Sequence, residues 1–485
     1  MTDSLKAVYI KTYGCQMNVY DSGRMLDIMR PHGFHHTDDI NTADVIILNT
    51  CTIREKAAEK VYSELGRILI LKNERTKLGK ETVIVIAGCV AQAEGKEVIR
   101  RAPFVDIVVG PQSYHNLPML LEQIKRNKSW IVKLDFEENN KFDLLPEELG
   151  KGSSISFLSI QEGCDKFCHF CVVPYTRGAE FSRPVSNIYR EALIMAKNGV
   201  KEIILLGQNV SAYRGLPPDI VEDHDIDHKI HKDLKNQENN TIIISDIQKN
   251  HKKNDNFNYW SLSKLIENIA NIKEIKRIGY TTSHPIDMLN DINLIFLHCT
   301  EKKLMPYLHL PVQSGSNKIL KSMNRKHTRE EYFQIINLFR KYRPDIALSS
   351  DFIVGYPGET DDDFADTIDL VKQIEYSQAF SFKYSARPGT PASEINNQID
   401  EKIKDQRLQI LQELLRKQQM IFNLQKIGDE MEVIFEKPGK KNGQVIGKSP
   451  YMQSVVCDGS LDIIGEIMNV KIVDAKQNSL FGKII

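Results

Sequence analysis

The chain has 485 residues, of which 41% are hydrophobic and 26% are charged. These proportions are typical of a globular protein with room for about three domains, and they exclude a largely disordered chain. The 64 basic and 64 acidic residues balance, which excludes a strongly basic nucleic-acid binder by bulk charge but permits a local basic surface. Apolar runs are far shorter than the ~20 residues of a membrane helix, and the N-terminus has no apolar signal core, so a cytoplasmic protein without membrane association is expected.

The first predicted domain, residues 6–122, alternates short apolar runs with amphipathic stretches. Runs such as 45–50 and 83–88 are typical of buried strands, and the stretch 53–72 carries apolar residues at helical spacing. This alternation predicts an open parallel α/β sheet with helices on both faces. Residues 127–154 are polar and acidic without a clear period, and we interpret them as a linker.

The second predicted domain, residues 150–420, repeats the alternation on a larger scale. Six units, each an apolar run followed by a polar loop, start at residues 157, 202, 277, 307, 347 and 380. They predict a partial (β/α)6 barrel, whose sites lie on loops at the carboxyl ends of the strands. Residues 217–258 interrupt the pattern. They contain four histidines but are rich in polar residues, and we interpret them as a solvated insertion rather than a metal site.

The third predicted domain, residues 423–485, consists of short apolar runs separated by Gly, Pro and Asn. This pattern predicts a small all-β barrel. A stretch at 403–422, rich in charge pairs at helical spacing, is predicted to be the helix that connects it to the larger barrel.

The strongest chemical signal is the spacing Cys164-x3-Cys168-x2-Cys171. Three thiolates in one loop can ligate three irons of a 4Fe–4S cluster and leave the fourth iron open to a substrate. Zinc is the alternative, but structural zinc needs four enclosing ligands, usually as paired Cys-x2-Cys units. His169 lies inside the loop, where it is awkwardly placed to be the fourth ligand, so we favour the cluster.

A second group of cysteines is scattered in the sequence. Cys15, Cys51 and Cys89 each follow directly on a predicted strand of the first domain. The carboxyl ends of such strands face one crevice, so three cysteines in this position favour a second cluster, although any one alone would be an ordinary buried cysteine. Cys299 and Cys457 lack this placement and are interpreted as packing residues.

The cysteine loop, with the aromatic Phe170 before its third cysteine, resembles that of the radical S-adenosylmethionine superfamily. The segments KTYGCQMNVYDS, ILNTCTIREKA, LLGQNV, TTSHP and LHLPVQSGS extend the resemblance to the methylthiotransferase family over nearly the whole chain outside 217–258. The C-terminal barrel resembles the TRAM domain, an RNA-binding module. The resemblance implies S-adenosylmethionine and two 4Fe–4S clusters as cofactors. The reductive cluster would be held by Cys164, Cys168 and Cys171, and a sulfur-carrying auxiliary cluster by Cys15, Cys51 and Cys89.

The reaction that the resemblance implies is the radical methylthiolation of C2 of N6-isopentenyladenosine at position 37 of tRNA. The implied partners are the isopentenylated anticodon stem-loop and an electron donor such as a flavodoxin or ferredoxin, and a monomer is expected. LLGQNV and GPQSYHNLP favour this substrate over N6-threonylcarbamoyladenosine in tRNA or an aspartate of a ribosomal protein. An iron–sulfur protein that binds RNA or senses redox state without turnover is the alternative from another class.

Polar residues at the ends of the predicted barrel strands are candidates to bind S-adenosylmethionine. With Phe170, they are Gly207, Gln208, Asn209, Gln313, Ser314, Gly355, Glu359 and Arg387. Thr281, Ser283 and His284 are candidates to line the same mouth. Residues of these types also form turns and helix caps, which is the alternative at each position.

The TRAM-like segment departs from the family pattern. It has Gly447-Lys448-Ser449 where an Arg-Thr pair is more usual, and lysine lacks the bidentate fork of arginine. Residues 421–485 contain eight lysines, no arginine and eight acidic residues. Basic side chains still gather locally at Lys437, Lys440, Lys441 and Lys448, so modest and salt-sensitive RNA binding is expected.

Overall fold

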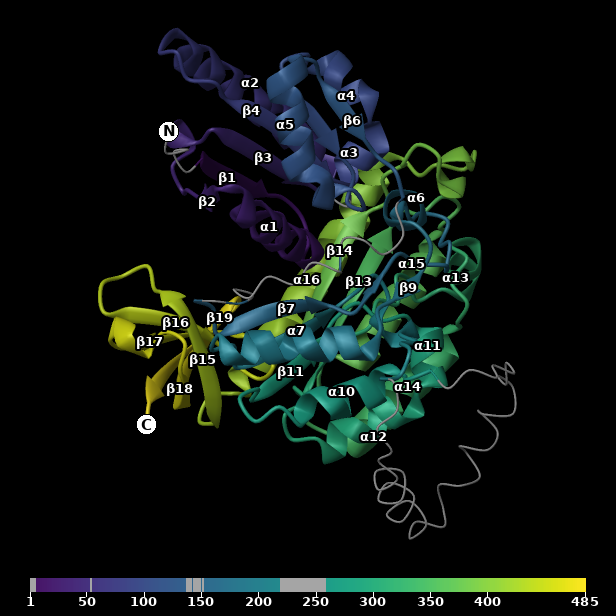
Figure 1. Ribbon diagram of the computed structural model, residues 1–485. Helices are drawn as coiled ribbons and strands as arrows, with labels where there is room; N and C mark the ends of the chain where they lie inside the picture. The colour runs from purple at the N-terminus through teal and green to yellow at the C-terminus, as the bar shows by residue number, and fades with distance from the viewer. Residues whose placement is uncertain (1–5, 53–54, 137–141, 143–149, 151, 219–258) are drawn as a thin grey trace. The chain divides into compact units, whose positions relative to one another are not determined.

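The computed structural model describes residues 6–52, 55–136, 142, 150, 152–218 and 259–485 (Figure 1). The chain divides into two compact units. The first comprises residues 1–151, 157–181 and 385–393, and the second comprises residues 152–156, 182–384 and 394–485. The loop with Cys164, Cys168 and Cys171 therefore belongs to the same unit as Cys15, Cys51 and Cys89. The insertion predicted at 217–258 lies outside the described residues from position 219 onward.

The first unit is built on a six-stranded sheet in the order β2-β1-β3-β4-β5-β6, in which every neighbouring pair is parallel. The strands are β1 (Lys6–Thr12), β2 (Phe34–His36), β3 (Val45–Thr50), β4 (Val83–Gly88), β5 (Ile107–Val109) and β6 (Ile131–Lys133). Strand β6 lies inside the segment interpreted as a linker, so that interpretation is wrong for residues 131–133. Strand β6 contains two apolar residues in a mostly polar segment, and its pairing with β5 reveals it.

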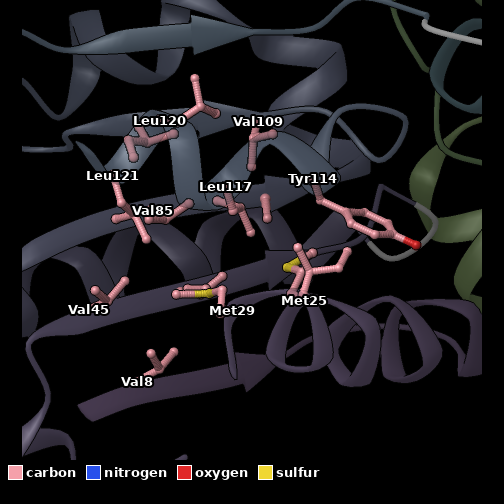
Figure 2. Close-up of a cluster of buried hydrophobic side chains, with 14 of the residues drawn as sticks. Val8, Met25, Met29, Val45, Val85, Val109, Tyr114, Leu117, Leu120 and Leu121 are labelled. Carbon is pink, nitrogen blue, oxygen red and sulfur yellow. The ribbon is translucent and has the colours of Figure 1, made fainter. Parts of the chain in front are cut away.

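Helices cover both faces of this sheet, as predicted. They are α1 (Gln16–Met29), α2 (Glu55–Lys77), α3 (Cys89–Glu94), α4 (Lys96–Arg101) and α5 (Leu117–Asn127). Helices α1 and α5 supply one buried cluster, and α2, α3 and α4 supply another. Figure 2 shows the first cluster, in which sheet residues such as Val45 and Val85 face Met29 of α1 and Leu117 of α5. Burial on both faces explains why these strands are apolar throughout.

The core of the second predicted domain is the expected partial barrel. Its six strands form two sheets, β11-β10-β7 and β12-β13-β14, in which β10 and β11, β12 and β13, and β13 and β14 pair in parallel. Backbone bonds from Ile278 N to Lys303 O (2.7 Å) and from Met305 N to Ile278 O (2.9 Å) link β11 to the chain that enters β12. The strands are β7 (Ile155–Ser159), β10 (Glu202–Leu206), β11 (Arg277–Tyr280), β12 (Tyr307–His309), β13 (Ala347–Val354) and β14 (Gln378–Lys383).

Helices alternate with these strands, which makes the barrel of the α/β type. They are α7 (Val185–Lys197), α10 (Leu262–Ala270), α11 (Pro285–Asn290), α12 (Ile292–Thr300), α13 (Asn317–Ser322), α14 (Arg329–Tyr342), α15 (Asp361–Ile374) and α16 (Glu401–Leu424). Cys299 on α12 is exposed, so its interpretation as a packing residue is wrong. The apolar run before it is one side of a surface helix, and the Cys299 thiol donates to the carbonyl of Tyr342 near the surface. Within the described residues, no helix is long and apolar enough to cross a bilayer.

The C-terminal segment forms a closed barrel in the order β15-β16-β17-β19-β18, as predicted. Its strands are β15 (Glu430–Pro438), β16 (Gln444–Lys448), β17 (Ser454–Asp458), β18 (Ile467–Lys476) and β19 (Ser479–Ile484). Cys457 is buried in its core beside Val445 and Val470, which confirms its role in packing. Arg277 at the start of β11 pairs with the buried Glu202 and donates two bonds of 3.2 Å to the carbonyl of Lys448. The small barrel therefore contacts the amino ends of the larger barrel's strands, away from the strand-end loops.

Two buried histidines should make the stability of the fold sensitive to mild acid. Burial lowers the pKa of His298 and of His327 to about 3, so both stay neutral in the folded protein while the unfolded chain takes up protons below pH ~6.5. Each histidine should therefore cost about 2 kcal/mol of folding free energy at pH 5 relative to pH 7. His327→Phe should remove one of these two losses, as chemical unfolding of variant and parent at both pH values would show. An equal loss of unfolding free energy between pH 7 and pH 5 in both proteins would contradict this prediction.

Candidate active site

The three N-terminal cysteines lie at the carboxyl ends of three adjacent strands. Cys15 follows β1 and is the N-cap of α1, Cys51 follows β3, and Cys89 follows β4 as the first residue of α3. The order β2-β1-β3 reverses the direction of strand addition between β1 and β3. Such a reversal opens a crevice beyond the strand ends, where open α/β sheets bind their ligands.

Cys15 and Cys51 are brought together by a glycine. Gly14 has φ +112°, and a Cβ on it would lie 2.1 Å from Cβ and 2.8 Å from Sγ of Cys51. A side chain at position 14 would therefore push the two loops apart. A hydrogen bond with the Cys51 thiol and the charge of Arg177 lower the pKa of Cys15 to about 6 against the effect of its burial. Burial raises the pKa of the Cys89 thiol, and the charge of Arg177 opposes that rise.

Asn18 is the polar side chain that holds these loops, and it was not among the predicted site residues. Its Nδ2 donates to the carbonyls of Tyr13 (3.1 Å) and Thr50 (2.8 Å), each close before a cysteine. Its Oδ1 accepts from the Cys15 thiol at 3.6 Å. Asn18 is completely buried. The available signal was its position three residues after Cys15, because asparagine is a poor helix former and the structure places it inside α1.

Replacing Asn18 by leucine should weaken the fold and the cysteine site together. The change leaves the carbonyls of Tyr13 and Thr50 buried without their donor, which should cost about 3 kcal/mol. We expect a lower unfolding midpoint and less iron per chain after reconstitution. Asn41→Leu, on the surface of the same domain, is the control and should change neither quantity. Wild-type iron content and stability in Asn18→Leu would show that the Asn18 side chain does not order the loops.

The second cysteine group lies in the loop between β8 (Gln161–Glu162) and β9 (Phe181–Ser182), which form a two-stranded sheet. Gly163 has φ +74°, and a Cβ on it would lie 1.9 Å from the carbonyl oxygen of Ala179, so only glycine fits before Cys164. Cys164 N donates to the carbonyl of Gly178 at 3.3 Å, and Cys171 N donates to that of Cys168 at 2.9 Å. Hydrogen bonds at the start and the end of the loop thus fold it back on itself.

Burial differs along this cysteine loop. Cys168 is buried, whereas Cys164, Cys171 and Phe170 are half-buried. Desolvation raises the pKa of the Cys164 thiol to about 11. Thiolates in such surroundings need a cation to compensate their charge, and iron ions would supply it.

Each cysteine group offers three thiol donors, the set that a 4Fe–4S cluster with one open iron requires. The described residues contain no His, Cys, Asp or Glu group whose side chains converge on a single metal ion. Cluster ligands do not need to converge in that way, because each cysteine binds a different iron. Both donor sets therefore fit clusters in their chemistry.

The candidate residues after β10 and β11 form one polar network. Asn209 Nδ2 donates to Asp287 Oδ2 at 2.7 Å, and its Oδ1 accepts from Ser211 Oγ at 2.8 Å. His284 N donates to Ser211 Oγ at 3.0 Å, and the His284 side chain caps α11. The structure thus brings Asn209 and His284 together at adjacent strand ends, with Gly207, Gln208, Thr281 and Ser283 beside them in sequence. Asp287 was not among the predicted site residues; it lies on the short helix α11.

The candidates after β12 and β13 take part in internal contacts. Gln313 has φ +78° and its backbone pairs with β13, while Ser314 Oγ lies 3.4 Å from Thr367 Oγ1. Glu359 Oε2 accepts from Gly355 N and from Arg407, each at 2.7 Å. Glu359 thus fixes the turn at Gly355, and these positions stay predictions as cofactor ligands. Arg387 belongs to the first unit and its carbonyl accepts from Thr390 N at 3.1 Å.

Comparison with known proteins first defines the class. Residues 158–371 match the radical SAM superfamily, residues 7–110 match the uncharacterized protein family UPF0004, and residues 424–485 match the TRAM domain. The protein is therefore a radical S-adenosylmethionine enzyme, and membership of this superfamily implies a 4Fe–4S cluster and S-adenosylmethionine as cofactors.

Full-length relatives narrow the class to one family. The chain is 55% identical over 482 residues to the tRNA-2-methylthio-N(6)-dimethylallyladenosine synthases of Rickettsia rickettsii (strain Sheila Smith) and Rickettsia conorii. The match spans 99% of this chain and 100% of each relative. The enzyme of the same name from Rickettsia bellii is 54% identical over 481 residues, 99% of each chain. The chain belongs to this family of radical S-adenosylmethionine tRNA methylthiotransferases.

Solved structures share the fold at much lower identity. A radical S-adenosylmethionine methyltransferase from Kitasatospora setae, with cobalamin and a [4Fe-4S] cluster bound, is 13% identical with a TM-score of 0.50, over 80% of this chain and 77% of that one. The cobalamin-dependent S-adenosylmethionine radical enzyme OxsB is 15% identical with a TM-score of 0.50, over 85% of this chain and 56% of that one. At these identities the likeness concerns the fold alone.

Proposed function

We propose that this enzyme converts N6-isopentenyladenosine at position 37 of tRNA into its 2-methylthio derivative, in the cytoplasm and as a monomer. One observation carries the proposal: two groups of three cysteines lie in one compact unit of a chain that resembles the dimethylallyladenosine-specific family over its full length. The sister substrates and the non-catalytic alternative have no comparable support.

The two cysteine groups have separate roles in this proposal. Cys164, Cys168 and Cys171 hold the cluster that binds S-adenosylmethionine, and Cys15, Cys51 and Cys89 hold the auxiliary cluster. When bound, the cofactors supply one-electron cleavage of S-adenosylmethionine, the methyl group and the sulfur, with an external donor such as a flavodoxin or ferredoxin providing the electrons. The protein's own contribution is to hold and shield the reacting groups. Cys51, Cys89 and Cys168 are each 8% exposed or less, which restricts the access of water to the thiolate ligands.

The tRNA contacts are assigned to the C-terminal barrel and the strand-end loops. Lys437, Lys440 and Lys441 are exposed around the hairpin between β15 and β16, a local basic surface on a domain of balanced charge. The position of Lys448 is supported by the two bonds from Arg277 to its carbonyl. Bases of an anticodon loop can be unstacked at low cost, which lets C2 of residue 37 reach a buried centre. Binding supported by a few lysines should weaken steeply with salt.

The test is complementation of a bacterial strain that lacks 2-methylthio modification. The gene is expressed, tRNA is digested, and nucleosides are measured by mass spectrometry. We expect N6-isopentenyladenosine to be converted to its 2-methylthio form. Unmodified nucleoside in cells that contain iron-loaded protein would overturn the substrate assignment, and purified enzyme would then be offered the sister substrates. Failure to cleave S-adenosylmethionine after reduction would favour the non-catalytic alternative, and zinc in place of iron would overturn the cluster assignment.

A further inference from the structure

Arg177 connects the two cysteine groups within the first unit. It is the last residue of α6 (Val173–Arg177), the short helix that begins two residues after Cys171. Its Nη2 donates to Oδ2 of Asp21 on α1 at 2.6 Å, and its Nη1 donates to Oε1 of Glu162 on β8 at 2.7 Å. The guanidinium thus bridges the helix that starts at Cys15 and the strand that precedes Cys164.

The contacts of Arg177 extend to Asn18, the side chain that holds the loops of the N-terminal cysteines. Its Nη2 lies 3.4 Å from Oδ1 of Asn18, the atom that also accepts from the Cys15 thiol. The backbone of Arg177 is fixed as well, because its carbonyl accepts from Gln112 Nε2 at 2.7 Å. With the Arg177 side chain 2% exposed and its two acidic partners similarly buried, the guanidinium has one defined position.

The electrostatic reach of Arg177 includes the thiols themselves. Its charge favours the thiolate form of both Cys15 and Cys89, which follow different strands. Inside a protein, the charge of a buried guanidinium is screened less than it would be in water. Net charge and hydrogen bonds near the sulfurs are among the factors that set the potential of an iron–sulfur cluster. A fixed cation should favour the reduced, more negative state.

We propose that Arg177 is a positioning residue that raises the reduction potential of the auxiliary cluster and places the Cys164–Cys171 loop against the N-terminal cysteines. This inference rests on the assignment of that cluster to Cys15, Cys51 and Cys89 under Proposed function. Helix α6 then has a role beyond packing. It follows the Cys164–Cys171 loop in sequence and places the charge of Arg177 beside the N-terminal cysteines.

The second unit contains a matched control. Arg183 donates to Oε2 of Glu191 at 2.6 Å, and both side chains are 1% exposed or less. This buried pair resembles that of Arg177 and Asp21 in length and burial, but it belongs to the other unit. Loss of either arginine leaves a buried carboxylate without its partner and should destabilise the protein. Only the loss of Arg177 should change the auxiliary cluster.

The experiment uses the full chain with Cys164, Cys168 and Cys171 replaced by alanine, so that the auxiliary site alone can hold a cluster. Arg177→Gln, Arg177→Lys and Arg183→Gln are made in this parent. Iron per chain and the midpoint potential, followed by electron paramagnetic resonance, are measured. We expect a more negative potential in Arg177→Gln, a value close to the parent in Arg177→Lys because the charge is kept, and the parental value in Arg183→Gln.

Each outcome decides the matter. A loaded Arg177→Gln protein with the parental potential overturns this inference and leaves the proposed function intact. If Arg177→Gln holds no iron, the Arg177→Lys variant distinguishes the explanations. Parental iron content and parental potential in Arg177→Lys would support a role of the positive charge. Loss of iron in Arg177→Lys would overturn that role. A parent that cannot hold a cluster overturns the auxiliary-site assignment, and this inference with it.

Discussion

Replacing Cys168 by alanine is expected to abolish both the cleavage of S-adenosylmethionine and the methylthiolation of tRNA. Cys168 is the buried member of its loop, so no water or neighbouring side chain would replace the lost thiolate easily. The loss should exceed the 10–100-fold that substitution beyond the ligand shell produces. Formation of 5′-deoxyadenosine and of the 2-methylthio nucleoside, both followed by mass spectrometry, measures the two steps.

The matched control for this variant is Cys299→Ala, because Cys299 is the exposed cysteine of α12. It should retain the activity and the iron content of the parent. Iron in Cys168→Ala should fall to the amount that the N-terminal group holds alone. If Cys168→Ala still cleaved S-adenosylmethionine, the loop would not be the reductive site.

Replacing Cys51 by alanine is expected to separate the two steps. The variant keeps the Cys164–Cys171 loop, so it should still form 5′-deoxyadenosine after reduction. Cys51 is 1% exposed and lies against Gly14, at the point where the loops of β1 and β3 meet. Its loss should remove one ligand of the auxiliary cluster and reduce the 2-methylthio product by more than two orders of magnitude, beyond the range for supporting residues.

Cys457→Ala is the control for the loss of a buried cysteine. Cys457 is also 1% exposed, but it packs in the C-terminal barrel. This variant should lose some stability through the small cavity and keep both activities. Wild-type methylthiolation by Cys51→Ala would show that the N-terminal cysteines do not supply the sulfur centre.

Periodicity in the sequence was sufficient for much of the fold. The strands β1, β3 and β4, the barrel strands and the five strands of the C-terminal barrel were predicted, because apolar or alternating runs at and beside them can be recognised locally. Strands β2 and β6 were missed, because β2 has one apolar residue and β6 has two. The side of α12 that Cys299 occupies also depends on neighbours that are distant in sequence.

The chain itself shows two features of the cysteines: their spacing within one loop, and the position of single cysteines just after predicted strands. Both can be predicted because covalent connection keeps such residues together in any fold that has those strands. The supporting network cannot be read in this way. Arg177 lies 156 positions from Asp21, and Asn18 lies 32 positions from Thr50. Asparagine, aspartate and arginine are ordinary surface residues, and burial reveals their role only after the sheet, α1 and α6 have packed. Local pattern therefore identifies the thiolate donors, and long-range packing decides which polar groups orient them.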